Sequence, residues 1–474
     1  MSEIANLQPV QVWKFFDLIC SIPHISKHEA ALAAALADAA SAAGLTVECD
    51  RIGNVIIRRE ASPGWENAPQ IILQAHMDMV PASEKEFDFI STPITPYIDG
   101  EWVKARGTTL GADDGIGVAH AMAIVTDPEF ECGKLTVILT VDEENGMSGA
   151  ANLAPAALQG KYMLNLDGSD RGFCIGCAGG ARQEFSFSAR WDELPENMPL
   201  YQITIDGLPG GHSGLCIHEN RGNAIKFMAE FISQIPDARI ISFNGGTADN
   251  AIPYQSAAII ATANLPEVMQ SLADAFIMTV KSDTPAAGNM VVKLAPASGS
   301  RCWDKALQDD IINAIILAPN EVIDFDDDLG IVKTSSNLAM IDTFEDHILI
   351  RSSQRSLVDA DRDDICAALK THFELFNAVS TLGSVYPATP PKSDALLLKT
   401  AIQCASVNGK SAKPYAIHAG LETGWFSMKN PDLEIISCGP DHHDYHTPNE
   451  KLNIPSVGEF DHFLRELIRK ISEK

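Results

Sequence analysis

The sequence predicts an α/β protein of two domains, with a second, α+β domain inserted into the first. Three observations indicate this fold class. The chain has 474 residues, 46% of them apolar, which is too long for one ordinary core. Strand and helix patterns typical of βαβ units fill residues 1–182 and resume in 388–474, the expected discontinuous domain. Residues 183–387 change character and form the expected insertion, with Gly179 and Gly180 as a hinge.

Composition excludes two classes of partner. The formal net charge is −28 and no Lys/Arg-rich patch offsets it, which argues against nucleic acid and anionic membranes. The sequence shows neither a signal peptide nor a membrane-spanning apolar run, so we expect a cytoplasmic protein. Ten scattered cysteines predict reduced thiols; Cys174 and Cys177 form a C-x-x-C without the second pair of a four-cysteine zinc site.

The first domain begins with a helix and several short strands. Ser26 and Glu29 have the spacing of a capping box before an alanine-rich helix, which Gly44 ends. Residues 79–103 contain three prolines and are expected to be irregular, and a helix is expected at 116–125. Strands are predicted at residues 47–49, 54–58, 71–76, 135–141 and 162–166.

The strand that ends at His76 is the first candidate site. Its continuous apolar run, rich in β-branched residues, is typical of a strand buried on both faces, and ligands bind at the carboxyl ends of such strands. His76 and Asp78 point the same way, so His76 can ligate a metal while Asp78 hydrogen-bonds the other ring nitrogen. A buried histidine paired with an acid is the alternative interpretation.

Asp113 and Asp114 form an acid pair between Gly111 and Gly115 at the start of the next helix. Two interpretations are open. The acids cap the helix and interact with its dipole, or Asp113 turns its carboxylate toward the histidine while the glycines permit an unusual backbone.

The next two predicted strands also end in acids. Asp142, Glu143 and Glu144 follow one strand, and Asp167 follows the other. Neighbouring carboxylates repel each other unless a cation or a shared proton relieves them, which indicates one acid as a ligand and another as a proton shuttle. A solvated acidic loop is the alternative for the first group. The repeated pattern favours a metal site with several carboxylates.

The insertion contains three notable polar groups. His212 lies between glycines, Asn250 precedes Ala-Ile-Pro, and Arg355 follows a serine-rich run. An incidental loop histidine remains the alternative for His212. Strands are expected at 184–188, 200–205, 239–243, 257–263 and 347–351, and helices at 223–235, 266–280, 303–317 and 360–376.

The C-terminal tail carries a histidine cluster before an amphipathic helix that begins near Ser456. Only His446, which Thr-Pro follows, has the rigid setting of a fixed ligand. His442 and His443 are expected at the surface.

These motifs together resemble the co-catalytic zinc peptidases that include peptidase T and carboxypeptidase G. The resemblance is closer to the bacterial aminoacyl-histidine dipeptidases and covers essentially the whole chain. The motifs are His76-Met77-Asp78, Gly111-Ala112-Asp113-Asp114-Gly115, Glu143-Glu144-Asn145-Gly146, Asp167, Gly210-Gly211-His212-Ser213-Gly214, His418-Ala419-Gly420-Leu421-Glu422 and His446-Thr447-Pro448. The chain departs from the family beside the ligands, which bears on substrate preference more than on metal binding.

The resemblance implies two Zn²⁺ ions, with Co²⁺ or Mn²⁺ as substitutes, and a set of residues for them. The ligands would be His76 and Asp167 for one ion, Glu144 and His446 for the other, and Asp113 as the bridge. Asp78 would orient His76 and Glu143 would be the general base. A cis peptide bond is expected between Asp113 and Asp114.

The function expected from this resemblance is hydrolysis of unblocked dipeptides, preferably Xaa-His, by a hydroxide that bridges the zincs. His212, on an inserted lid, would donate to the oxyanion, and Arg355 would bind the substrate carboxylate. Asn250 and His418 are further candidates for substrate contacts. We expect a homodimer. The alternatives are another exopeptidase (a tripeptide aminopeptidase or a carboxypeptidase), an N-acyl amino-acid hydrolase, or a non-catalytic metal-binding protein.

Overall fold

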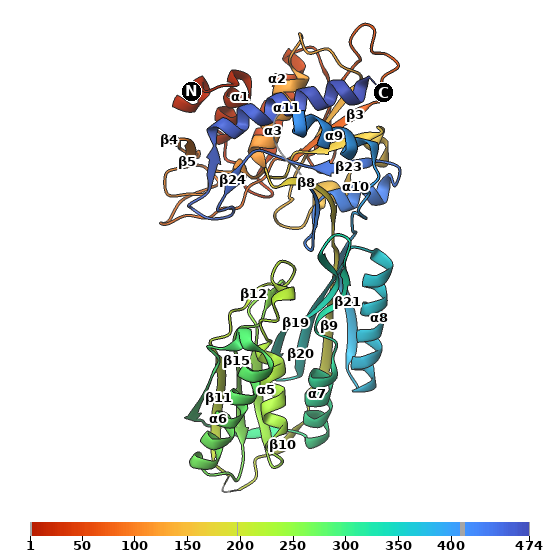
Figure 1. Cartoon of the computed structure of the whole chain (residues 1–474). Coiled ribbons are helices and arrows are strands. Elements are labelled where there is room, and N and C mark those ends of the chain that lie inside the picture. Colours follow the sequence, from red (N-terminus) through yellow and green to blue (C-terminus); the bar gives the residue numbers. More distant parts are fainter. Residues whose placement is uncertain (1, 197, 408–412, 474) are drawn as a thin grey trace. The chain divides into compact units, whose positions relative to one another are not determined.

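The computed structural model describes residues 2–196, 198–407 and 413–473, which form two compact units (Figure 1). Unit 1 comprises residues 1–177, 389–416 and 421–474. Unit 2 comprises residues 178–388 together with the short segment 417–420. A piece of the C-terminal tail thus belongs to the inserted unit.

The main sheet of unit 1 mixes parallel and antiparallel strands. Its order in the described residues is β1 (Thr46–Cys49), β2 (Val55–Arg59), β6 (Leu135–Thr140), β3 (Ile71–His76), β7 (Tyr162–Asn165), β23 (Glu434–Ser437), β8 (Gly172–Cys177) and β22 (Lys413–Ile417). The central strands β6, β3, β7 and β23 are parallel to one another. Their carboxyl ends therefore meet at one edge of the sheet.

Burial of both faces explains the apolar runs in these strands. Every residue of β3 and of β6 is buried, as expected for parallel strands with helices on either face. Helix α3 packs against β3 and α1, and is apolar around almost its whole circumference. The helices of unit 1 are α1 (Val10–Cys20), α2 (Ala30–Ala42), α3 (Ala112–Val125), α4 (Ser148–Asn152), α9 (Leu396–Val407), α10 (Thr423–Lys429) and α11 (Ile454–Ser472).

Two local predictions in unit 1 are wrong. The proposed capping box before α2 does not form, because Ser26 Oγ donates to Asp78 and the Glu29 carboxylate accepts the amide of Asp142. Residues 79–103 are not wholly irregular, because they contain β4 (Pro96–Asp99) and the start of β5 (Trp102–Ala105).

These strands belong to a second, small sheet. Its order is β24 (His442–His443), β25 (Lys451–Asn453), β5 and β4. Strand β4 lies at the edge of this sheet, where a proline at the first position removes no ladder hydrogen bond. The sheet joins a segment of the tail to the residues that precede α3.

Unit 2 is built on an antiparallel sheet with one buried face. The strand order in the described part of the unit is β16 (Val291–Pro296), β11 (Leu200–Asp206), β15 (Ser256–Ala261), β13 (Arg239–Gly245), β19 (Ile331–Thr343), β20 (His347–Ser356), β9 (Gly179–Ser188) and β21 (Val379–Tyr386), with β18 (Glu321–Asp326) paired to β19. Burial alternates along β11, as in a sheet with one covered face. The apolar core lies between this face and the helices α5 (Ala224–Ser233), α6 (Pro266–Asp283), α7 (Lys305–Leu317) and α8 (Asp359–Leu375).

Each strand and helix expected in the insertion is present, with shifts of a few residues at the ends, but several strands were missed. Gly179 and Gly180, the expected hinge, lie in strand β9. A Cβ on Gly180 would come within 2.3 Å of the Tyr386 ring, so this glycine leaves room for packing inside unit 2.

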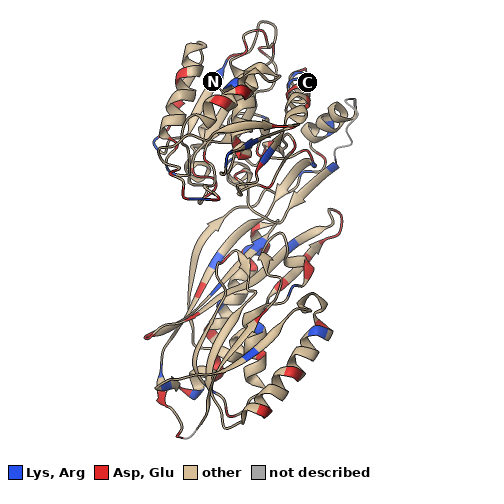
Figure 2. Ribbon diagram, turned by 90° about the vertical axis from the view of Figure 1, so that its left-hand side faces the viewer, with Lys and Arg blue, Asp and Glu red and all other residues tan. Residues whose placement is uncertain are grey.

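Charged residues of both signs are interspersed along both units in the view of Figure 2. No basic stripe is visible there to offset the net charge of −28. Among the described residues, we find no helix with the length and apolarity needed to span a bilayer.

Candidate metal centre

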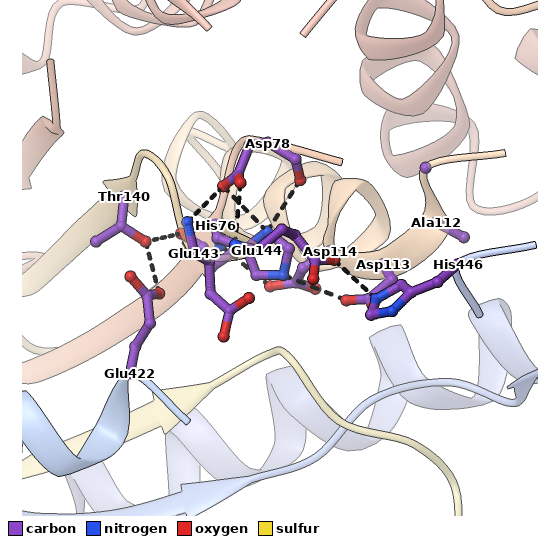
Figure 3. Close-up of polar contacts among 12 residues, drawn as sticks. His76, Asp78, Ala112, Asp113, Asp114, Thr140, Glu143, Glu144, Glu422 and His446 are labelled. Carbon is purple, nitrogen blue, oxygen red and sulfur yellow. Dashed lines mark hydrogen bonds and ion pairs between the residues drawn. The ribbon is translucent and has the colours of Figure 1, made fainter. Parts of the chain in front are cut away.

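The predicted ligands come together at the ends of three parallel strands of unit 1, and Figure 3 labels four of them, His76, Asp113, Glu144 and His446. His76 ends β3, Glu143 and Glu144 follow β6, and Asp167 follows β7. The tail that continues from β23 supplies His446. These residues form three groups of potential ligands, and within each group the ligand atoms lie within 4.8 Å of one another. The groups are His76/Asp113/Asp167, Asp113/Glu144/His446 and His76/Glu143/Glu144.

Asp113 is the member that the first two groups share. Its Oδ1 lies 3.2 Å from His76 Nε2, and its Oδ2 lies 3.3 Å from His446 Nε2. His446 Nε2 is also 2.9 Å from Glu144 Oε1. A carboxylate that presents one oxygen to each of two histidines has the arrangement needed to bridge two ions.

The turn that presents Asp113 departs from helical geometry. The peptide bond between Asp113 and Asp114 is cis, as predicted, and both residues have non-helical dihedral angles. The N-cap of α3 is Gly111, with φ of 72°, so neither acid serves as the cap. A Cβ at Gly111 would contact Met79 Sδ at 3.0 Å, which explains the glycine.

Asp78 supports the site in two ways. His76 Nδ1 lies 3.0 Å from the backbone carbonyl oxygen of Asp78 and 3.6 Å from its carboxylate Oδ1. The carboxylate accepts hydrogen bonds from the amides of Glu143 (2.9 Å) and Glu144 (3.1 Å). Burial raises the pKa of Asp78, but His76, the Ser26 hydroxyl and the Glu143 amide outweigh it and hold the pKa at about 2. The Asp78 backbone thus contacts the imidazole, while its side chain fixes the two glutamates.

The electrostatics of the cluster fit a bound cation. Burial, followed by the nearby Asp113 carboxylate, raises the pKa of Asp167 to about 7. Burial likewise raises the pKa of Glu143 well above its ordinary value, although His76 opposes this. Among the described residues, no lysine or arginine forms an ion pair with these carboxylates or with Glu144. Oxygen and imidazole donors of this kind suit Zn²⁺, Co²⁺ or Mn²⁺.

Two features of the site were missed or misjudged from the sequence. His442 was expected at the surface, but it is 6% exposed because it pairs in the small sheet and packs edge-on against Tyr445. Glu422, 2% exposed, accepts hydrogen bonds from Thr140 and Gln74, and burial raises its pKa to about 7. The signal for this network was Gln74, a polar residue inside an otherwise apolar buried strand.

The other predicted residues lie in unit 2. The His212 and Asn250 motifs meet because β12 (Gly211–His212) pairs with β14 (Ala251–Ile252), and the Ser213 amide donates to the Asn250 carbonyl. His418 belongs to the segment 417–420 and hydrogen-bonds Ser335 Oγ at 2.7 Å. Ser335 is in turn the register partner of Arg355.

The environment of His212 fixes its tautomer. Its Nδ1 accepts the amides of Gly214 and Leu215, each at 3.1 Å. The ring proton is therefore on Nε2, which is a donor. Burial and the nearby Arg355 lower the pKa of His212 to about 4, so the imidazole is neutral at pH 7.

Arg355 is a buried cation without an acid. It is 7% exposed, and its Nη1 donates to Tyr386 Oη at 2.6 Å. Its buried Nε has no hydrogen-bond partner, and no described carboxylate lies within ion-pair distance. A buried guanidinium in this state favours an anionic ligand, since leaving it unpaired is costly.

Comparisons with known proteins identify a family for this chain. A family model described as peptidase family M20/M25/M40 matches residues 72–470. The cytosol non-specific dipeptidase of Escherichia coli (strain K12) is 37% identical, and the alignment covers 100% of both chains. The crystal structure of aminoacylhistidine dipeptidase from Vibrio alginolyticus is 36% identical, with a TM-score of 0.90 over 99% of this chain and 98% of that one.

A more distant structure shares the fold alone. Aminopeptidase PepT from Bacillus cereus ATCC 10987 is 16% identical, with a TM-score of 0.59 over 99% of this chain and 100% of that chain.

The full-length similarity to the Escherichia coli dipeptidase confirms the resemblance inferred from the motifs. Because the family model matches residues 72–470, which include most of unit 1 and the whole insertion, this chain belongs to peptidase family M20/M25/M40.

Proposed function

We propose that this peptidase is a metal-dependent dipeptidase that hydrolyses unblocked dipeptides, preferably those with a C-terminal histidine. The proposal of metal dependence rests on one observation. Asp113 offers one carboxylate oxygen to each of two histidines, and a further acid, Asp167 or Glu144, lies beside each histidine. The names of the Escherichia coli and Vibrio alginolyticus relatives support dipeptides as the substrate class.

The proposed ligands divide into two sets with one shared member. His76 and Asp167 would hold one divalent ion, Glu144 and His446 the other, and Asp113 both. Two such ions, when bound, would lower the pKa of water and polarise the scissile carbonyl. We propose Zn²⁺ as the resident metal, with Co²⁺ or Mn²⁺ as substitutes.

Glu143 is the proposed general base. It follows β6 directly before the ligand Glu144, and Asp78 fixes its backbone. Its pKa, raised by burial, suits a group that takes a proton from water and passes it to the leaving amine. As a base it would accept the proton on its carboxylate and release it when the peptide bond breaks.

Unit 2 would provide the contacts to the substrate. His212 Nε2–H is a donor available to the oxyanion, because Nδ1 is occupied by two backbone amides. Arg355 would bind the C-terminal carboxylate of the dipeptide, with Asn250 and His418 nearby in the same unit. We also propose that the protein is a homodimer in the cytosol. The cytosolic location is supported by the Escherichia coli relative, which is a cytosol non-specific dipeptidase.

The test uses the purified full-length protein, stripped of metal and reloaded with Zn²⁺, Co²⁺ or Mn²⁺. Elemental analysis should find two ions per chain, and chelation should abolish activity that metal restores. The substrate panel contains Xaa-His dipeptides, other dipeptides, a tripeptide, a C-terminally amidated dipeptide and an N-acyl amino acid. Fastest turnover of the tripeptide or of the N-acyl compound would identify one of the alternative activities, and a protein that holds no metal would refute the metal centre.

A further inference from the structure

A single buried carboxylate organises the turn that carries Asp113. Glu450 is 2% exposed. Its Oε2 accepts the amides of Leu110 (2.7 Å) and Gly111 (3.0 Å), and its Oε1 accepts those of Ala112 (2.8 Å) and Asp113 (3.2 Å). Four consecutive backbone N–H groups thus converge on one side chain. The amides of Ala112 and Asp113 are in the first turn of α3, where the helix leaves them without partners, and those of Gly111 and Leu110 directly precede it.

The same residue is also fixed to the loop that carries His446. The Glu450 amide donates to the carbonyl of Thr447 at 3.1 Å, which closes a turn directly after His446. Thr447 Oγ1 donates to the Asp444 carbonyl at 2.7 Å, so the histidine lies inside a hydrogen-bonded loop. The next residue begins β25, which pairs with β5. Glu450 therefore connects two ligand-bearing segments that are more than 300 residues apart in the sequence.

Only a carboxylate satisfies this geometry. Four N–H donors need two oxygens that each accept twice, and an ionised glutamate has that capacity. A glutamine would turn its NH₂ group toward two of the donors and lose half of the bonds. Among the described residues no lysine or arginine pairs with Glu450. Burial, followed by the Asp113 carboxylate, raises the pKa of Glu450 to about 7, and the backbone amides at the helix N-terminus oppose this by favouring its ionised form.

We propose that Glu450 is a positioning residue that sets the separation of the Asp113 carboxylate and the His446 imidazole, and thereby the affinity for the metal they share. The inference rests on the metal centre proposed above. Partners of metal ligands outside the coordination shell typically change affinity by about 10–100-fold when mutated. Glu450 differs from such partners in that it holds the backbone of one ligand and the loop of another.

The test is a metal titration of the full-length, metal-stripped protein against a competing chelator. In Glu450→Gln, Zn²⁺ affinity should fall by roughly 10–100-fold, and activity should recover when Zn²⁺ is raised. The matched control is Asp461→Asn. Asp461 is another buried acid of unit 1. Its Oδ1 lies 3.6 Å from Nδ1 of His120 on α3, and its Oδ2 accepts a hydrogen bond from Arg465 Nε. This control should lower thermal stability without changing metal affinity.

Each outcome decides between the explanations. If Asp461→Asn weakens Zn²⁺ binding as much as Glu450→Gln, the effect is a general loss of stability and the proposal is wrong. It is also wrong if the parent binds Zn²⁺ and Glu450→Gln binds it equally well. If Glu450→Gln does not fold, Glu450→Asp decides, because it keeps both oxygens but is one methylene shorter; unchanged affinity there overturns the proposal. A parent without Zn²⁺ affinity refutes the proposed function itself.

Discussion

The candidate sites of the two units are electrostatically incomplete in opposite ways. In unit 1, four carboxylates gather around two histidines, and no described lysine or arginine pairs with them. In unit 2, Arg355 is buried without an acid, beside the neutral His212 and His418. The first site is stabilised by added cations and the second by an added anion. A dipeptide with a free carboxylate fits the second requirement, as divalent ions fit the first.

The two sites are also built differently. In unit 1, His76, Glu144 and Asp167 stand at the ends of parallel strands or in the turns that follow, where α/β sheets place ligands. Asp113 at the start of α3 and His446 in the C-terminal tail complete the group. Arg355 and Ser335, in contrast, lie within the paired part of two long antiparallel strands, and His212 lies on a separate two-stranded ribbon. The strand-end positions in unit 1 could be recognised in the sequence, whereas the strand pairing that places the unit 2 residues could not.

The largest effect is expected from Glu143→Ala in unit 1. The variant removes the proposed base but no residue assigned to a metal, so kcat should fall by roughly 10²–10⁴-fold while metal content is unchanged. Steady-state kinetics with elemental analysis of the same sample checks both quantities. Turnover close to that of the parent in a metal-loaded variant would exclude Glu143 as the base.

His212→Ala tests the proposed donor in unit 2. Loss of one oxyanion donor typically lowers kcat by about 10²–10³-fold, and KM should change much less because the bond forms in the transition state. The metal content should equal that of the parent. A variant that loses zinc would place His212 among the metal ligands, against the present assignment.

Arg355→Gln should have a smaller effect and should depend on the substrate. Hydrogen bonds to charged groups contribute about 1.5–3 kcal/mol, so kcat/KM for a dipeptide should fall by roughly 10–100-fold. For a C-terminally amidated dipeptide, parent and variant should be nearly equal. The control is Arg351→Gln on the same strand, because Arg351 is already paired with Glu184 and Asp342. Equal losses with both substrates would contradict carboxylate recognition by Arg355.

The smallest effect is expected from the protonation of His212, which makes the stability of the folded protein depend on pH. Its pKa in the folded protein, about 4, lies below the ordinary 6.5, so the unfolded chain binds the proton first as pH falls. The contribution of the neutral imidazole to the free energy of unfolding is complete above pH 6.5, and it is lost progressively as the pH falls to 4. Imidazole NMR signals should show His212 neutral from pH 8 to pH 5, and His212→Gln should flatten the pH dependence of unfolding in that range. A midpoint near 6.5 would show that the histidine is not held neutral.

Most of the metal centre could be predicted because local sequence encodes it. A parallel strand buried on both faces is largely apolar, so a histidine at its last position, as with His76, or an acid two residues beyond it, as with Asp167, marks the carboxyl edge of the sheet. The cis bond at Asp113 followed from the family resemblance. His212 was found as a loop histidine with a poor packing role, and Arg355 as a guanidinium suited to a substrate carboxylate.

The partners of these residues could not be predicted, because they come from distant segments. Ser26 bonds Asp78 instead of capping its own helix, since a charged acceptor is the stronger partner. Glu450 bonds backbone amides, which carry no sequence signature. Strand β19 was missed because its buried residues Ser335 and Asn337 are polar, and they bond His418 and the Ala251 carbonyl. Polar residues that line a site break the apolar pattern that identifies a strand.

The position of β23 in the main sheet has a consequence for how the protein is made. This strand lies between β7 and β8, although it begins at Glu434 and those strands come from the first 177 residues. During synthesis on the ribosome, residues 178–388 can pack as an almost continuous unit while the sheet of unit 1 still lacks a central strand. The acids that follow β6 and β7 therefore lack His446 until nearly the whole chain has been synthesised, so the full set of candidate ligands comes together late in folding.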